Sequence, residues 1–212
     1  MAKEQGFIRD NLEKVMRLVE ILGHFHNSPL LSKTLVLKGG TAINLTIFDL
    51  PRLSVDIDLD YCRSIEREEM LADRGIITDK ISKYMMANGY VLSPKSKSYH
   101  ALDSFVYEYV NCGGTKDNLK IEINYMLRCH VLPVARREVR LPWNEEKLTV
   151  FSVAPLEIFA SKTVALLTRT APRDLYDMHN MVKIGLFDES EEAMLRKCVV
   201  FYSAIGSAQP PE

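Results

Sequence analysis

Two aspartates separated by a single residue form the part of this 212-residue chain best suited to chemistry. Asp56 and Asp58 alternate with aliphatic residues in the segment Ser54-Val-Asp-Ile-Asp-Leu. Alternation with a period of two places both carboxylates on the same face of a strand. Two like charges held close together repel each other unless a cation lies between them. The spacing therefore indicates a divalent metal site, of the kind at which Mg²⁺ or Mn²⁺ holds a nucleoside triphosphate (NTP).

A third carboxylate is expected on a neighbouring strand, because such metal sites use two or three acidic side chains. The segment Lys120-Ile-Glu-Ile-Asn-Tyr alternates in the same way, and its Glu122 lies on the face opposite the two isoleucines that flank it. The predicted metal ligands, which are also candidate catalytic residues, are therefore Asp56, Asp58 and Glu122. Asp60 continues the face of the aspartate pair, but we expect it to be solvated near the strand end.

A glycine pair lies a short helix upstream of the aspartates, where the apolar run Leu35-Val-Leu-Lys ends in Gly39-Gly40-Thr41. Paired glycines let a backbone approach a phosphate closely, and free N–H groups of a following helix can bind an anion. The Thr41 hydroxyl could add a further donor. The alternative for the aspartates alone is a solvated acidic edge strand, but the combination favours a nucleotide site. Its candidate nucleotide-binding residues here are Lys38, Gly39, Gly40 and Thr41.

Further charged candidates lie in the helical C-terminal part of the chain. Lys162 is flanked by apolar residues at helical spacing, so it is either a surface lysine with a buried stem or a cation aimed into a cleft. Asp174 and Asp177 are three residues apart and share one helical face. Their alternative interpretation is a solvated face, or for Asp174 a favourable position at a helix N-terminus.

These motifs resemble those of one known family. Gly39-Gly40-Thr41 followed by Arg52-Leu-Ser54 and the Asp56/Asp58 pair is similar to the opening motif of nucleotidyltransferase-like toxins of the AbiEii/AbiGii type. That family belongs to the DNA polymerase β-like nucleotidyltransferase superfamily, which often has serine in place of Thr41. Its downstream lysine and R-D-x-x-D helix are matched in order, and the matching residues are Lys162, Arg173, Asp174 and Asp177.

The resemblance implies roles for these residues and a reaction. Arg52, Ser54 and Arg173 join the nucleotide-binding candidates, Lys162 contacts the nucleotide phosphates, and Asp174 or Asp177 completes the active site. The implied enzyme is a Mg²⁺-dependent nucleotidyltransferase that moves an NMP from an NTP to an acceptor hydroxyl, with a tRNA 3′ end as the acceptor. It is a toxin whose cognate antitoxin is encoded alongside. Two alternatives are transfer to a protein hydroxyl and a non-catalytic nucleotide-binding regulator.

Composition sets broad limits on these functions. The net charge is −1, so no global field attracts a polyanion, and RNA would need a local basic patch. Arg128, Arg136, Arg137 and Arg140 are either that patch or a solvated basic segment. No apolar run could span a bilayer, and the N-terminus lacks the apolar core of a signal peptide. The four cysteines have no CxxC spacing, which predicts a reduced, cytoplasmic protein.

The elements that must position these residues follow from apolar periodicity and turn residues. We predict an α+β fold with a polymerase-β-like core, in which a mixed sheet with flanking helices occupies residues 1–153. A helical part completes the cleft over residues 154–212, although the family usually continues into more C-terminal helices. Helices are expected over 8–26, 42–48, 65–88, 155–169, 173–184 and 190–205, and strands over 35–38, 55–61, 90–97, 104–110, 119–125, 137–141 and 148–153.

Overall fold

The computed structural model describes residues 6–48, 52–141 and 147–206. The chain divides into two compact units. The sheet unit comprises Met1–Cys129 and Arg136–Ser152, and the helical unit comprises His130–Ala135 and Val153–Glu212. The α+β prediction, with a mixed sheet followed by a helical C-terminal part, is confirmed. No helix among the described residues is both long and apolar enough to cross a membrane.

The sheet carries the candidate metal ligands on two adjacent strands. Its strand order is β3-β5-β6-β2-β1-β8-β7, with β4 also paired to β5. β2 runs antiparallel to β1 but parallel to β6, and β5 is antiparallel to β6, so the sheet is mixed. The bounds are β1 Leu35–Lys38, β2 Asp56–Tyr61, β3 Val91–Leu92, β4 Lys97–Ser98, β5 Leu102–Val110, β6 Lys116–Asn124, β7 Ala135–Glu138 and β8 Thr149–Ser152.

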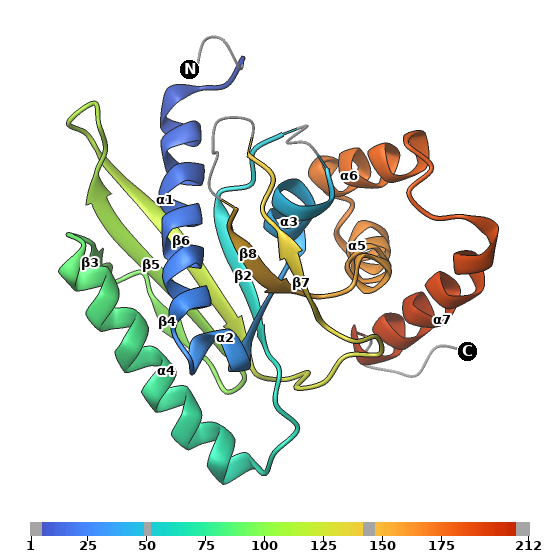
Figure 1. The fold of residues 1–212 in the computed structure, drawn as a ribbon, viewed down its shortest axis with the longest axis horizontal. Helices are drawn as coiled ribbons and strands as arrows, with labels where there is room; N and C mark the ends of the chain where they lie inside the picture. The colour runs from blue at the N-terminus through green and yellow to red at the C-terminus, as the bar shows by residue number, and fades with distance from the viewer. Residues whose placement is uncertain (1–5, 49–51, 142–146, 207–212) are drawn as a thin grey trace. The chain divides into compact units, whose positions relative to one another are not determined.

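One face of this sheet is apolar and is covered by two long helices, α1 (Arg9–Asn27) and α4 (Arg67–Ala87) (Figure 1). Strand residues of odd number, such as Ile57, Leu59 and Ile121, are buried on that face. The helices contribute apolar side chains at helical spacing, including Leu18, Leu22, Ile77 and Ile81, which are almost completely buried. Burial of the odd positions leaves Asp56, Asp58 and Glu122 on the opposite face, as the period-two pattern predicts.

Two expected elements differ in the structure. The helix expected over 42–48 begins earlier, as α3 (Gly39–Ala42), and continues as a π-helical turn over Ile43–Ile47. The Asn44 side chain donates to the Gly40 carbonyl oxygen at 2.6 Å, which supplies a partner for a carbonyl in this irregular turn. The long strand expected over 90–97 is wrong, since only the short strands β3 and β4 form there. A short helix, α2 (Leu31–Thr34), was not expected from the pattern.

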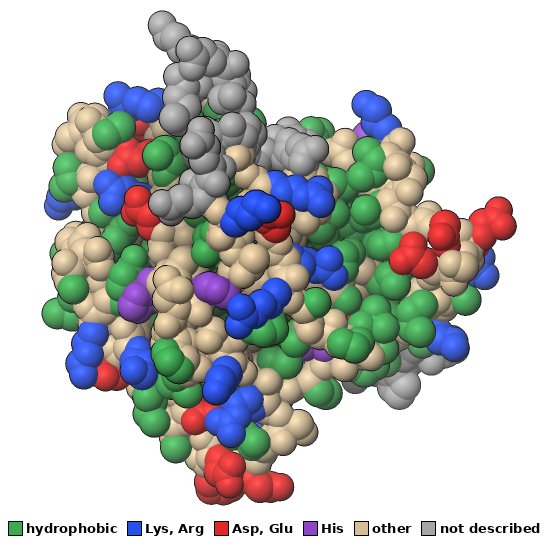
Figure 2. All heavy atoms as spheres, viewed as in Figure 1, with side chains coloured by type: hydrophobic (Ala, Val, Ile, Leu, Met, Phe, Trp, Pro, Cys, Tyr) green, Lys and Arg blue, Asp and Glu red, His purple; other side chains and the backbone are tan. Residues whose placement is uncertain are grey.

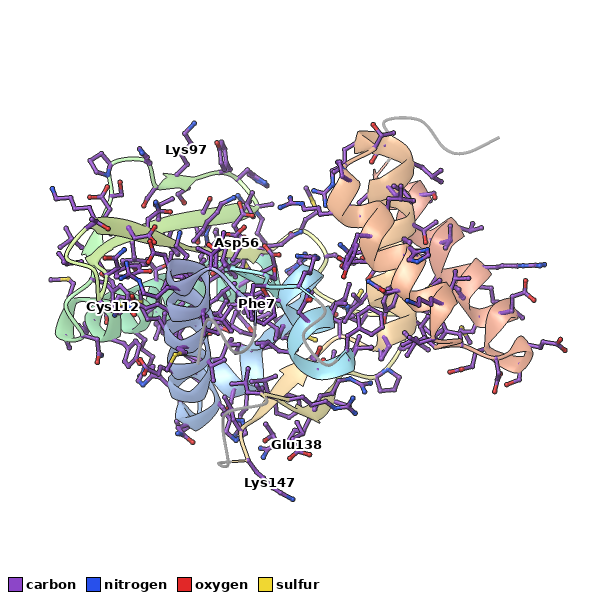
Figure 3. All side chains as sticks on the ribbon, turned by 90° about the horizontal axis from the view of Figure 1, so that it is seen from above. Phe7, Asp56, Lys97, Cys112, Glu138 and Lys147 are labelled. Carbon is purple, nitrogen blue, oxygen red and sulfur yellow. The ribbon has the colours of Figure 1, made fainter. Side chains whose placement is uncertain are left out.

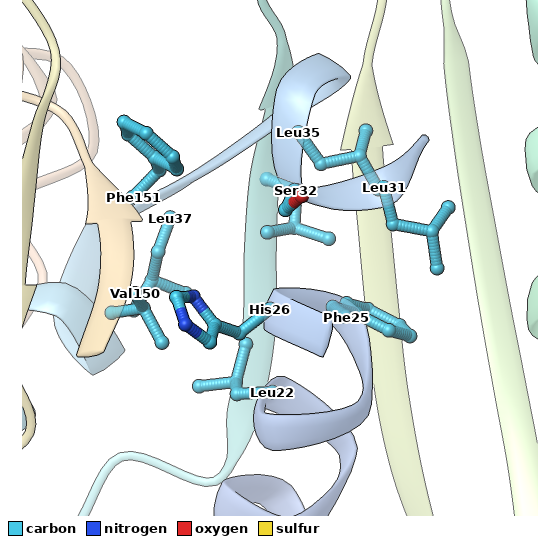
Figure 4. Close-up of a pocket in the computed structure, with 10 residues that line it drawn as sticks. Leu22, Phe25, His26, Leu31, Ser32, Leu35, Leu37, Val150 and Phe151 are labelled. Carbon is cyan, nitrogen blue, oxygen red and sulfur yellow. The ribbon is translucent and has the colours of Figure 1, made fainter. Parts of the chain in front are cut away.

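A small cavity lies in the apolar layer between the end of α1 and strands β1 and β8 (Figure 4). Leu22, Leu37 and Val150 are among the residues that line it, and the His26 ring points toward it. Its volume is about 20 Å³, which is room for one water molecule and far too little for a nucleotide. His24, two residues before His26 on α1, stacks on Tyr84 of α4 with ring centroids 3.8 Å apart.

The helical unit is built from α5 (Pro155–Arg169), α6 (Pro172–Lys183) and α7 (Glu189–Gly206). Proline occupies the first turn of both α5 and α6, where a backbone N–H would have no acceptor within the helix, so the absence of this N–H costs no hydrogen bond. Buried Glu157 on α5 accepts a hydrogen bond from the Tyr202 hydroxyl of α7 at 2.9 Å. Figure 2 shows hydrophobic side chains gathered over the helices of this unit, and the exposed ones include Leu167, Leu175 and Val182.

Candidate functional site

The candidate carboxylates lie together on adjacent strands of the sheet unit. Asp56 and Asp58 project from β2 on the face opposite the buried Ile57, and Figure 3 labels Asp56 at the beginning of that strand. In the parallel β2–β6 pairing Asp58 is the direct partner of Glu122, and Asp56 is the direct partner of Lys120. We name this set of Asp56, Asp58, Lys120 and Glu122 the carboxylate face. Direct strand partners point to the same side of a sheet, so three acidic groups and one ammonium share a small surface.

Electrostatics within the carboxylate face disfavour the ionised form of its central aspartate. Burial raises the pKa of the Asp58 carboxyl, Lys38 opposes that rise, and the charges of Asp56 and Glu122 add to it. Burial alone would lower the pKa of Lys120, but its hydrogen bond with Glu122 and the nearby aspartates outweigh burial and raise it. Negative charge is therefore concentrated here, and a bound cation would be favoured.

Glu122 is turned toward Lys120 on its own strand. The Lys120 Nζ lies 2.9 Å from Glu122 Oε1, and both side chains are partly exposed. Among the described residues, no three His, Cys, Asp or Glu side chains are grouped closely enough to hold a metal ion. The structure thus brings Glu122 beside Asp58, as expected, but does not place the three carboxylates as one closed ligand set. The lysine of this pair was not recognised in the sequence, although its spacing of two from Glu122 placed it on the same face.

The backbone of Gly39 lies against the Asp58 carboxylate. Its φ is +69°, a left-handed conformation that residues with a Cβ rarely adopt. A Cβ built on Gly39 would lie 2.5 Å from Asp58 Oδ2, closer than real Cβ contacts allow. The glycine therefore permits both the turn that follows β1 and the close approach of this backbone to the acidic site.

Replacing Gly39 with alanine should displace the Asp58 carboxylate as well as strain the turn. We expect Gly39→Ala to lower the free energy of unfolding by about 1–3 kcal/mol and to reduce transferase activity. Gly89→Ala is the matched control, because Gly89 has a φ of +79° and a Cβ added there would meet nothing within 4 Å. Thermal unfolding measures the stability of the Gly39→Ala and Gly89→Ala variants, and an activity assay measures their activity. Equal loss of stability with full activity in both variants would contradict a role for the Gly39–Asp58 contact.

Three nucleotide-binding candidates lie around Gly40. A Cβ on Gly40 would lie 3.0 Å from both Arg52 Nη2 and Ser54 Oγ, so these side chains cover its backbone. Thr41 is fully buried, and its hydroxyl is hydrogen-bonded to Ser54 Oγ at 3.0 Å and to the carbonyl oxygen of Asp56. The expected donation from Thr41 to a phosphate is corrected accordingly: its hydroxyl is taken up by protein partners, and it ties the glycine turn to the start of β2.

Lys38 forms an ion pair with Asp60 across the β1–β2 pairing. Asp60 is only 4% exposed, so the expectation that it is solvated at the strand end is wrong. The reason is that β1 continues alongside β2 as far as Tyr61, and the Lys38 ammonium compensates the buried charge. Lys38 stays next to the carboxylate face, where its charge also acts on Asp58.

The helical unit contains its own buried ion cluster. Lys162 Nζ lies 3.0 Å from Asp174 Oδ1 and 2.9 Å from Asp177 Oδ2. The lysine side chain is 7% exposed and both aspartates are fully buried, so the interpretations as a surface lysine and a solvated acidic face are wrong. Arg169 adds a second cation, with its Nε 2.6 Å from Asp174 Oδ2. The exposed Arg173 was predicted in this region, whereas Arg169, five residues before Asp174, was missed.

Acid should weaken this cluster at a defined pH. Burial alone would raise the pKa of Asp174, but hydrogen bonds and charges from Arg169 and Lys162 outweigh it and lower the pKa to about 2. A depressed folded-state pKa stabilises the protein above the unfolded value near 4, and this contribution is lost as the pH falls toward 2. We expect the stability advantage of the wild type over Asp174→Asn to shrink by about 1–2 kcal/mol over that range in urea titrations. A pH-independent difference would contradict this assignment.

The four arginines of the basic segment have different local contacts. Arg128 Nη1 donates to the Ile65 carbonyl oxygen at 2.6 Å, and Arg140 Nη1 donates to the Ile47 carbonyl oxygen at 3.3 Å. Arg136 lies over the Phe151 ring, and burial lowers the pKa of Arg137. Arg128 and Arg140 are thus each held by a backbone carbonyl, and Arg136 by an aromatic ring.

Comparisons with known proteins bear on the family and the fold of the chain. The chain matches the family model of the nucleotidyl transferase AbiEii toxin of type IV toxin–antitoxin systems over residues 21–207. A comparison with curated proteins gives no match. One similar solved structure is MenT4, a nucleotidyltransferase toxin from Mycobacterium tuberculosis H37Rv, with a TM-score of 0.58 and 18% identity over 95% of this chain and 68% of that one. Since the family model covers most of the chain, this protein belongs to the AbiEii nucleotidyl transferase toxin family.

Proposed function

We propose that this nucleotidyltransferase toxin transfers an NMP from an NTP to the 3′ hydroxyl of a tRNA, and that the transfer needs Mg²⁺ or Mn²⁺. The observation that carries the proposal is the carboxylate face, in which Asp58 pairs with Glu122 next to Asp56 and Gly39 contacts Asp58. In this reaction the acceptor hydroxyl loses its proton to solvent and its oxygen bonds to the α-phosphorus, while the bond from that phosphorus to the α,β-bridging oxygen breaks and pyrophosphate leaves.

The donor set fits a hard divalent cation. Asp56 and Asp58 supply carboxylate oxygens, which such cations prefer, and Glu122 is the adjacent third acid. The raised pKa of Asp58, due first to burial and then increased by the charges of Asp56 and Glu122, indicates charge that a cation would stabilise. When bound, such a cation would neutralise charge on the triphosphate and on the transition state.

The residues around Gly39 are proposed to bind the nucleotide. Gly39 and Gly40 bring backbone close to the acidic site, where a side chain would block approach. Arg52 and Ser54 lie against Gly40 and can contact phosphate or ribose oxygens from there. Lys38, already beside Asp58, adds positive charge for the triphosphate. Thr41 acts by holding the turn against the Asp56 backbone.

In the helical unit, Lys162 is proposed to neutralise phosphate charge, as the family resemblance implies. Asp174 and Asp177 both contact its ammonium, which supports a role for the pair in orienting this lysine. The exposed Arg173 at the start of α6 is proposed as a further phosphate contact. A buried lysine held by two carboxylates has few accessible rotamers, so its charge is preorganised.

The proposal is tested by incubating purified protein with each of the four labelled NTPs, Mg²⁺ or Mn²⁺, and either total tRNA or total protein. We expect label from one NTP or a subset of NTPs on tRNA 3′ ends, and no label when EDTA replaces the metal. Label found only on protein would identify a protein-modifying enzyme and overturn the tRNA acceptor. Nucleotide binding without any transfer would identify a non-catalytic regulator.

The family also supports a proposal about partners. Type IV toxins are one half of a toxin–antitoxin system, so we propose that a cognate antitoxin encoded alongside relieves the growth arrest caused by this protein in the cytoplasm. Co-expression with the neighbouring gene tests this proposal: continued arrest in the presence of that gene product would contradict it.

A further inference from the structure

The carboxylate face contains a lysine that has no assigned part in nucleotidyl transfer. Lys120 is the direct strand partner of Asp56 and lies two residues before Glu122, so its ammonium is surrounded by acidic side chains. Its Nζ is 2.9 Å from Glu122 Oε1. The side chain is 37% exposed, so it is free to rotate toward solvent.

Glu122 lies beside the acids of β2 but is paired with Lys120. The parallel register places Glu122 directly beside Asp58, the position from which a third metal ligand would come. Its carboxylate nevertheless reaches Lys120, and in the part of the chain that the structure describes the three acids do not form a ligand group. Ser104, the strand partner of Glu122 on β5, is small and uncharged, so the positively charged group in contact with Glu122 comes from its own strand.

We propose that Lys120 is a positioning residue that occupies Glu122 until a divalent cation binds, and that Glu122 then exchanges the ammonium for the metal. This inference rests on the proposed metal-dependent transfer. Without metal, the ammonium offsets one of the negative charges of the carboxylate face, and its release leaves Asp56, Asp58 and Glu122 for the cation. The resident ammonium weakens metal affinity, because each exchange must break an existing ion pair.

The test is a double-mutant cycle on Mn²⁺ affinity, measured by the electron paramagnetic resonance signal of free Mn²⁺ with no nucleotide present. Lys120→Met removes the ammonium and keeps most of the stem, and we expect it to tighten Mn²⁺ binding about threefold to tenfold. Glu122→Gln should weaken Mn²⁺ binding, and the double variant Lys120→Met/Glu122→Gln should bind Mn²⁺ no more tightly than Glu122→Gln alone. Lys116→Met on the same strand face is the matched control, since it lies about 13 Å from Lys120 and should leave affinity unchanged.

The outcomes separate this inference from the function on which it rests. In one outcome, Lys120→Met tightens Mn²⁺ binding by the same factor in the wild-type background and in the Glu122→Gln background. That result would show only a general charge effect and would overturn the exchange. Unchanged or weaker binding in Lys120→Met would also overturn it. With either of these two results for Lys120→Met, loss of Mn²⁺ binding in Asp58→Asn would mean that the metal site stands and only the role of Lys120 is wrong. If Asp58→Asn binds Mn²⁺ as the wild type does, the metal site itself is wrong.

A structural effect of the substitution is checked independently. Thermal unfolding in EDTA should show similar melting temperatures for the wild type, Lys120→Met and Lys120→Gln, because the pair is partly exposed and such pairs contribute little stability. Lys120→Gln replaces Lys120→Met in the cycle if the latter fails to fold. Added Mn²⁺ should raise the melting temperature of the Lys120 variants more than that of the wild type.

Discussion

Asp58→Asn should abolish nucleotidyl transfer while leaving the protein folded and no less stable. Asp58 is the central acid of the carboxylate face, with Asp56 beside it on β2 and Glu122 opposite it on β6. Changing groups that merely orient metal ligands already lowers activity about 10–100-fold, so loss of a ligand should lower it at least about 100-fold. Burial raises the pKa of Asp58, which means that the folded protein disfavours its charge. Replacing the ionised Asp58 carboxylate with a neutral asparagine side chain therefore removes a charge that is unfavourable in the folded protein.

The combination of lost activity and retained or increased melting temperature distinguishes a functional residue from a structural one. Asp79→Asn is the matched control, because Asp79 is an exposed aspartate on α4 that pairs only locally with Lys83. We expect that variant to keep full activity in the same labelled-NTP assay. Wild-type activity in Asp58→Asn would end the case for a metal-dependent site on this strand, and a marked loss of stability would indicate a structural role.

Lys162→Met should give the largest loss of stability of the substitutions considered. It leaves Asp174 and Asp177, both fully buried, without the ammonium that contacts each of them. Removing one partner of a buried ion pair typically lowers the free energy of unfolding by about 3–5 kcal/mol. Arg169 still contacts Asp174 after the substitution, so that aspartate keeps one cationic partner. Urea unfolding followed by far-ultraviolet circular dichroism measures the change.

A second variant separates the structural role of Lys162 from its proposed contact with phosphate. Lys162→Met combined with Asp177→Asn removes one buried negative charge together with the ammonium, and it should recover part of the lost stability. If the recovered protein is still inactive, the Lys162–Asp177 pair has a role beyond stability; if activity returns with stability, Lys162 acts only through the fold. Lys183→Met, at an exposed position at the end of α6, should change stability by less than about 0.5 kcal/mol. A similar small effect in Lys162→Met would contradict the buried cluster.

The period-two pattern was sufficient to predict the sides on which β2 and β6 present their charges. It predicted Asp56, Asp58 and Glu122 on one face because alternation is a local property of an extended chain. It could not predict the pairing of Asp58 with Glu122, since the register joins residues more than sixty positions apart and depends on packing across the whole sheet. The glycine pair predicted a close approach of the backbone to a phosphate, but neither the left-handed conformation of Gly39 nor its proximity to Asp58.

The helical candidates show where local patterns are insufficient. An apolar surrounding fits a buried lysine and a surface lysine equally well, so the burial of Lys162 depended on whether α6 supplied carboxylates. Arg169 was missed because it reaches Asp174 across the break between α5 and α6, where Thr170 adopts a left-handed conformation with φ 48°. The π-helical turn after Gly40 was also unforeseen, because single π turns have no strong sequence signal.

The central place of β2 in the sheet has a consequence for the timescale on which the site can change. β2 is hydrogen-bonded to β1 on one edge and to β6 on the other, so its backbone can open only when neighbouring strands separate. Amides of such strands exchange with solvent slowly, often through global unfolding. Rotations of partly exposed side chains, in contrast, take picoseconds to nanoseconds. The acids can therefore rearrange by changing side-chain rotamers without any opening of the β2 backbone.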